Sequence, residues 1–211
     1  MAGCGSGASG NGVAAKSASQ IYNEAKAATS GASSVRYSGQ LQNSGKTISL
    51  DIVAAGRRGG GTITVQGATL NVVTSGTSLF LKASAAAWEK LGAPAAAAGL
   101  VANKWLQTTT SNKSFGSFAN FTNQSKLVGS ISAKHTPTKG KQTTVGGLSA
   151  ITLVDKGNGT LFVATTGKPY ILEIKSTQTN DSGTITFSDY NAAKPPAVPS
   201  NAVNINSLTG G

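Results

Sequence analysis

The feature that most constrains this chain is an alternation of apolar and polar residues that begins at Val35 and recurs almost to the C-terminus. Leu50 and Ile52, for example, alternate with Ser49 and Asp51. A period of two puts successive side chains on opposite faces of a strand, so each such segment predicts a half-buried β-strand. The segments are 35–41, 47–52, 62–65, 70–72, 79–81, 104–108, 147–155, 160–165, 170–176 and 184–190. They predict about nine or ten strands in a single domain.

Short turns separate many of these segments. Glycine occurs with serine, asparagine or aspartate at residues 75–76, 157–159 and 181–183, and with proline at residues 167–169. Short turns join neighbouring antiparallel strands. The predicted sheet is therefore antiparallel, with strands that pair largely in chain order.

One amphipathic helix is predicted ahead of the strands, over residues 15–29. Ser17 lies three positions before Gln20, which is the spacing of a capping box, and Ile21 and Ala25 follow at helical spacing. Gly31 is expected to end the helix.

The strand pattern is interrupted between residues 84 and 131. Alanine-rich residues 84–91 and 94–103 predict short helices, and residues 115–131 predict one or two more. Phe115, Phe118 and Phe121 recur at intervals of three, which places them on one helical face.

The size of the predicted sheet determines how the helix can pack. About ten strands of roughly 17–20 Å present an apolar face on the order of 800 Å², whereas a helix of about 15 residues is only about 22 Å long and 10 Å wide. We therefore predict an α+β fold in which a strongly curved antiparallel sheet, a half-open β-barrel, wraps the N-terminal helix, with the short helices as a lid. Apolar surface left uncovered would enclose a cavity for a hydrophobic ligand. The alternative is an interior that its own side chains fill, as in small barrels.

The candidate cavity residues are apolar positions on the inner face of the predicted sheet, together with three phenylalanines of the predicted lid. Each of them could equally be an ordinary core residue. They are Leu50, Ile52, Ile63, Val65, Leu70, Val72, Phe115, Phe118 and Phe121.

Cys4, the single cysteine, follows Ala2 and Gly3, and Ala-Gly-Cys is the end of a bacterial lipobox. Only three residues precede Cys4, so the sequence does not include the apolar segment that normally leads to a lipobox. The Gly/Ser-rich residues that follow are typical of a flexible tether. We expect Cys4 to be lipidated, the alternative being an incidental thiol. The expected division is a lipobox remnant and tether at residues 1–14, a single domain at 15–208 and a tail at 209–211.

The net charge of +11 arises from 18 Lys and Arg against 7 Asp and Glu, yet only 12% of residues are charged. The basic charge is spread thinly, and aromatic residues are not interleaved with it as nucleic-acid stacking would require. We expect no nucleic-acid partner. Anionic lipid headgroups or acidic wall polymers fit this charge better.

No catalytic constellation stands out in the sequence. His135 is the only histidine, lies in a basic, turn-rich stretch with no neighbouring acid, and is expected to be exposed. The carboxylates show no spacing for a metal site or an acid/base pair. They are Glu24, Asp51, Glu89, Asp155, Glu173, Asp181 and Asp189. We expect no enzymatic activity, no cofactor and no metal.

The order of elements and three stretches carry a family resemblance. Residues 104–106 (KWL), 159–174 (GTLFVATTGKPYILEI) and 184–191 (TITFSDYN) resemble actinobacterial lipoproteins of the LppX/LprG type, whose fold is similar to that of the periplasmic carrier LolA. The resemblance covers residues 15–208 and implies a half-open barrel, an acyl-chain cavity, and shuttling or presentation of lipids or glycolipids. It also implies lipidation at the lipobox cysteine, which maps onto Cys4.

The leading functional hypothesis is therefore a membrane-anchored lipid or glycolipid carrier on the extracytoplasmic face of the cell membrane. It would be a monomer, with a membrane transporter or a wall polymer as a further candidate partner. The competing hypothesis is an envelope protein with a filled core that binds anionic wall polymers or docks a protein partner on an exposed sheet edge.

Overall fold

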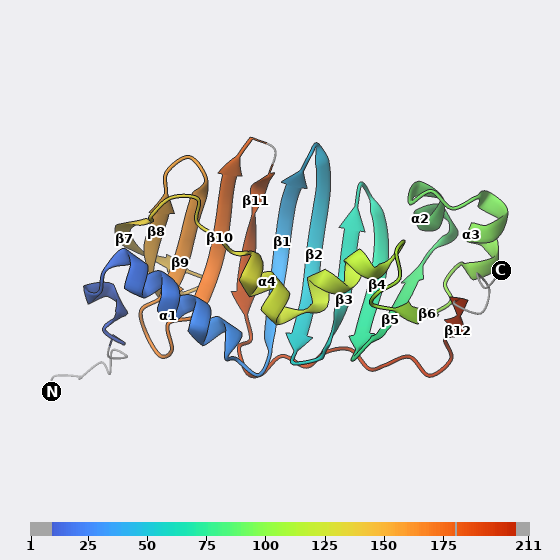
Figure 1. Cartoon of the computed structure of the whole chain (residues 1–211), viewed down its shortest axis with the longest axis horizontal. Coiled ribbons are helices and arrows are strands. Elements are labelled where there is room, and N and C mark those ends of the chain that lie inside the picture. The colour runs from blue at the N-terminus through green and yellow to red at the C-terminus, as the bar shows by residue number, and fades with distance from the viewer. Residues whose placement is uncertain (1–9, 180, 206–211) are drawn as a thin grey trace, which may run out of the picture.

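The computed structural model describes residues 10–179 and 181–205, and within them the chain forms one twelve-stranded sheet with helices on one face (Figure 1). The strand order is β12-β6-β5-β4-β3-β2-β1-β11-β10-β9-β8-β7. The predicted α+β fold is confirmed, because the sheet is large, is not closed into a barrel and is accompanied by few helices.

The first half of the sheet follows chain order, since each strand pairs with the next in an antiparallel register. Its strands are β1 (Val35–Asn43), β2 (Lys46–Ala55), β3 (Arg58–Val65), β4 (Ala68–Ser75), β5 (Ser78–Ala83) and β6 (Leu106–Thr109). The second half is a meander that returns to β1, which it meets through β11. Its strands are β7 (Thr138–Val145), β8 (Leu148–Asp155), β9 (Gly159–Ala164), β10 (Ile171–Gln178) and β11 (Asp181–Ser188).

The N-terminal helix α1 (Ala18–Ser30) has the predicted capping box. Gln20 N donates to Ser17 Oγ at 3.3 Å, and Ser17 N donates to Gln20 Oε1 at 3.0 Å, so two otherwise unpaired N–H groups are satisfied. The helix begins three residues later than predicted, because η1 (Val13–Ala15), a turn of 3-10 helix, occupies the preceding residues. Ile21 and Ala25 are buried, which fixes the face of α1 that packs on the sheet.

Four short helices lie between β5 and β7. Helices α2 (Ala85–Lys90) and α3 (Ala95–Val101) form a pair at the β4–β6 end of the sheet, whereas η2 (Gly116–Thr122) and α4 (Gln124–Ser130) cross its middle (Figure 1). The alanine-rich helices α2 and α3 therefore do not lie beside α1. Of the four short helices predicted to form the lid, η2 and α4 cover the middle of the sheet.

Two strands were not predicted: β7 contains few apolar residues, and β12 has only two residues. Strand β7 lies in the basic stretch around His135, and it is exposed along most of its length because it forms one edge of the sheet. Lys139 and Lys141 lie on β7 next to a register shift, and lysine and bulges are ordinary means of blunting a sheet edge. Strand β12 (Val203–Asn204) pairs with β6 in a parallel register, so the sheet is not wholly antiparallel.

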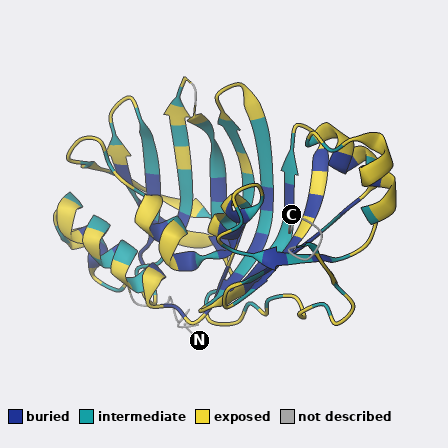
Figure 2. Ribbon diagram, turned by 45° about the vertical axis from the view of Figure 1, so that its right-hand side comes forward, coloured by how far each residue is buried: buried dark blue, intermediate teal, exposed yellow. Residues whose placement is uncertain are grey.

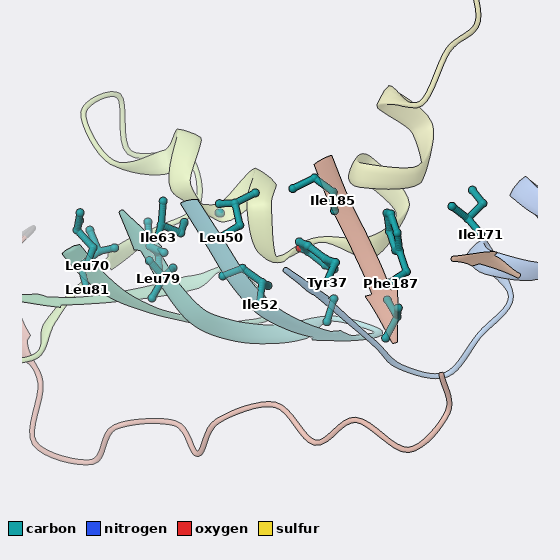
Figure 3. Close-up of a cluster of buried hydrophobic side chains, with 14 of the residues drawn as sticks. Tyr37, Leu50, Ile52, Ile63, Leu70, Leu79, Leu81, Ile171, Ile185 and Phe187 are labelled. Carbon is teal, nitrogen blue, oxygen red and sulfur yellow. The ribbon is translucent and has the colours of Figure 1, made fainter. Parts of the chain in front are cut away.

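The core lies between the curved sheet and the helices that cover it (Figure 2). Side chains from both halves of the sheet project into it, as Figure 3 shows for Ile52, Tyr37 and Ile171. Within the described residues, no helix combines the length and apolar character needed to cross a bilayer. Cys4, on which the predicted anchor depends, lies outside the described residues.

Candidate ligand cavity

The predicted cavity residues share one face of the sheet, but they belong to its packed middle. Leu50, Ile52, Ile63, Leu70 and Val72 are all buried, and Val65 is partly buried against the same cluster. In Figure 3 the labelled side chains of this group project from the sheet toward the covering segment.

The phenylalanines of the predicted lid help to fill this region. Phe115, Phe118 and Phe121 are partly buried against the core. Phe118 and Phe121 lie on η2, a 3-10 helix, and Phe115 is the residue just before its first turn. A 3-10 helix has three residues per turn, so an interval of three aligns side chains closely. Phe115 also packs edge-to-face on Trp88 of α2, with 6.0 Å between the ring centroids. A buried bond from Thr74 Oγ1 to Thr122 Oγ1, 2.9 Å long, holds η2 to β4.

An open apolar cavity of about 250 Å³ lies farther along the same face, where α1 and α4 cover strands β8–β11. None of the nine predicted residues lines it, so their role in ligand binding stays a prediction. Its apolar wall comes from both halves of the sheet and from the cover. The main apolar lining residues are Leu41, Leu127, Ile131, Leu153, Leu161, Ile174, Ile185 and Phe187.

The cover over the cavity is tied to α1 by hydrogen bonds to main-chain oxygens. Tyr22 Oη and Lys26 Nζ both donate to the carbonyl oxygen of Ile131, at 2.8 and 2.6 Å. Gln124, which is buried on α4, donates from Nε2 to the carbonyl oxygens of Thr29 and Ala32 at 2.6 and 3.1 Å. The two Gln124 bonds are made to carbonyl groups at or just after the C-terminal end of α1, where helical hydrogen bonds run out. Helix α1 therefore positions the cover as well as packing on the sheet.

A buried polar atom lies beside the cavity wall. Tyr37 of β1 packs against Phe187 with 6.0 Å between ring centroids, and Figure 3 shows the two side chains together. Within the described part of the chain, the Tyr37 hydroxyl is buried without a hydrogen-bond partner. Burial raises its pKa, so the group stays neutral. Tyr37 does not itself line the cavity, and only Phe187, on which it packs, belongs to the wall.

The cavity has a polar rim centred on Asp155. The backbone N–H of Lys134 donates to Asp155 Oδ2 at 2.7 Å, and His135 Nδ1 lies 3.0 Å from Oδ1. Asn158 Nδ2 donates to the same Oδ1 at 3.1 Å, and Lys134 Nζ donates to Gln178 Oε1 at 2.9 Å. These contacts fasten residues 131–137, several of which line the cavity, to the ends of β8 and β10.

His135 is 68% exposed, as predicted, but it does have an acidic partner in Asp155, which the linear sequence did not show. Within residues 10–179 and 181–205, no group of His, Cys, Asp and Glu could hold a metal ion. The His135–Asp155 pair fastens a loop, and no nucleophilic side chain is hydrogen-bonded to it in the described contacts.

The attachment of residues 131–137 should depend on pH. Desolvation acts to raise the pKa of Asp155, but hydrogen bonds from Asn158, the Lys134 amide and His135 outweigh it and hold that pKa below its usual range. The stabilisation is therefore present above the ordinary carboxyl pKa of about 3.9 and is lost as pH falls through the lower, folded value. We expect the NMR shift of the Lys134 amide proton to titrate with a midpoint below about 3.9. In Asp155→Asn this titration should vanish. A wild-type midpoint above about 3.9 would contradict the conclusion that hydrogen bonds lower the pKa of Asp155.

No protein family model matches the sequence, and no curated protein matches it. Solved structures do. LprF from Mycobacterium bovis has a TM-score of 0.56 at 14% identity, over 88% of this chain and 97% of LprF. The lipoprotein LppX from Mycobacterium tuberculosis has a TM-score of 0.54 at 14% identity, over 86% of this chain and 98% of LppX. The chain therefore has the same fold as LprF and LppX, which confirms the fold that the resemblance implied.

Proposed function

We propose that this protein is a membrane-anchored lipoprotein that binds the acyl part of a lipid or glycolipid and carries or presents it at the cell envelope. The observation that carries the proposal is the apolar cavity between α1, α4 and strands β8–β11. It has a hydrophobic wall and a polar rim, which are the parts an amphipathic ligand would need.

The size of the cavity favours part of one acyl chain. Ligand pockets usually span about 300–1,000 Å³, and this cavity of about 250 Å³ lies just below that range. Each buried methylene contributes about 0.8 kcal/mol, so six of them would provide roughly 5 kcal/mol. Larger cargo would require η2 and α4 to move away from the packed middle of the sheet, where Leu50, Ile63 and Leu70 would then be uncovered.

The proposed lipid anchor and envelope location are supported by the sequence around Cys4 and by the fold, not by the cavity. Cys4 stands at the end of a lipobox-like sequence, and LppX, which has the same fold, is a lipoprotein. We therefore place the protein on the extracytoplasmic face of the membrane, attached through Cys4. We propose a binding protein rather than an enzyme, because the His135–Asp155 contact fastens a loop instead of activating a nucleophile.

Uptake of lipid by the purified, delipidated chain tests the proposal. We expect saturable binding of a fluorescent fatty acid at a stoichiometry of about one. We also expect native mass spectrometry to find acylated lipid on protein from an envelope extract. The competing function, binding of acidic wall polymers, predicts no uptake of fatty acid and polymer binding that salt abolishes. That pair of results would contradict the carrier.

A further inference from the structure

Helix α3 leaves an unusually apolar surface uncovered at one end of the molecule. Leu100 is 72% exposed, more than any other large hydrophobic residue of the described chain. Only Ala98 of α3 is buried, and it fixes the helix to the rest of the fold. The remaining exposed positions form what we call the α3 patch, which consists of Ala95, Ala96, Ala97, Gly99 and Leu100. In Figure 2 the helices at this end are largely coloured as exposed.

The α3 patch lies in an uncharged segment with lysines around it. Residues 91–103 contain no charged side chain, and Lys90 and Lys104 flank them directly. Lys82 of β5 lies over Trp105, with Nζ 5.9 Å from the ring centroid, so a partly buried tryptophan borders the same region. Glu89 is the one acidic residue among these neighbours, and the net charge around the patch is positive.

This combination matches the interface of a bilayer. Small and aliphatic side chains can enter the region between headgroups and acyl chains, tryptophan is enriched at that depth, and lysines pair with anionic headgroups. The segment offers few polar side chains for the directional hydrogen bonds that a protein partner would use. The chain's charge of +11 adds a general attraction to the same kind of surface.

We propose that the α3 patch is a membrane-docking surface that inserts Leu100 into the interface of an anionic bilayer. It lies at the β4–β6 end of the sheet, whereas α1 and the cavity lie at the other end (Figure 1). The patch is therefore not part of the cavity wall, and the inference does not depend on the proposed function. Docking should be weak and reversible, with a partition constant on the order of that of a single myristoyl chain, about 10⁴ M⁻¹.

Vesicle co-sedimentation of the full chain, prepared without lipid on Cys4, tests the docking surface. The vesicles are phosphatidylcholine alone or phosphatidylcholine with about a third phosphatidylglycerol. We expect binding to the anionic vesicles only, and Leu100→Asp should weaken it at least tenfold, or roughly the loss of one buried leucine. Lys90→Gln and Lys104→Gln should each weaken it about fivefold.

Leu148 provides the matched control. It is 51% exposed on β8, near the opposite edge of the sheet, so Leu148→Asp makes the same chemical change elsewhere and should alter binding less than twofold. A fluorescent NBD group on Leu100→Cys in a Cys4→Ser background should shift to the blue on anionic vesicles, and the same group on Leu148→Cys should not. Equal loss in both Asp variants, or equal blue shifts, would overturn the proposal in favour of general charge attraction. A dimer that Leu100→Asp dissociates, without vesicle binding, would overturn it in favour of a second copy.

Discussion

Filling the cavity with a single large side chain should remove lipid uptake while the sheet stays folded. Ile174 lies on β10 and is part of the apolar wall, so its side chain borders open space. Tryptophan at this position would occupy much of the 250 Å³ that an acyl chain needs. We expect Ile174→Trp to lower the affinity for a fluorescent fatty acid at least tenfold, which corresponds to the loss of two or so buried methylenes. Fluorescence titration measures the affinity, and circular dichroism reports whether the sheet remains.

Thr177 on the same strand is the control for this substitution. It is exposed and does not line the cavity, so Thr177→Trp adds the same side chain to β10 without entering the open space. Its affinity for fatty acid should stay within about twofold of the unmodified chain. If Ile174→Trp and Thr177→Trp both bind fatty acid normally, the cavity is not the binding site. The packed face of the sheet beneath η2 would then be the next candidate.

Local signals in the sequence predicted local structure well. The capping box of Ser17 and Gln20 fixes where α1 begins, because the two residues satisfy each other's hydrogen bonds within one turn. The period of two in β2 likewise predicted that Leu50 and Ile52 share the buried face, because which face a side chain takes depends only on alternation within the strand.

The position of the cavity could not be predicted in this way. Alternation shows which side chains share a face, but it does not show that β11 pairs with β1. Nor does it show that η2 packs directly on β2–β4 while an open cavity remains over β8–β11. Ile174, Ile185 and Leu161 alternate just as Leu50 and Ile63 do, so sequence pattern alone could not separate cavity wall from filled core. The same limit applies to His135 and Asp155, whose contact depends on how a loop folds back on β8.

Strand β7 was not predicted because an edge strand needs no buried face. Its residues are mostly exposed lysine, threonine and glutamine, and its pairing with β8 comes from backbone hydrogen bonds that leave no apolar signature.

The turn predicted at residues 181–183 is instead the beginning of β11, since Gly183 lies within the strand. Its glycine marks a close backbone approach between strands and not a chain reversal.

Two glycines at the junction between the halves of the sheet should be essential for its shape. Gly39 on β1 has φ +153°, and a Cβ at this position would lie 2.0 Å from the carbonyl oxygen of Thr184 on β11. Gly183, with φ +146°, makes the reciprocal approach, 2.2 Å from the carbonyl oxygen of Gln40. Both obstacles are backbone atoms, which cannot turn aside as a side chain could, so a methyl group would force the two strands apart.

We expect Gly39→Ala to lower the free energy of unfolding by about 3 kcal/mol or more, because it combines backbone strain with overpacking at a strand pairing. Gly45 supplies the control, since it also has a positive φ of +78° but no heavy atom within 4 Å of the position that an added Cβ would take. Gly45→Ala should therefore cost only the left-handed backbone penalty of about 1–2 kcal/mol. Urea unfolding of the two variants measures the difference. Equal losses would mean that β1 and β11 can separate without strain, and the curvature that encloses the cavity would then have to come from the covering helices instead.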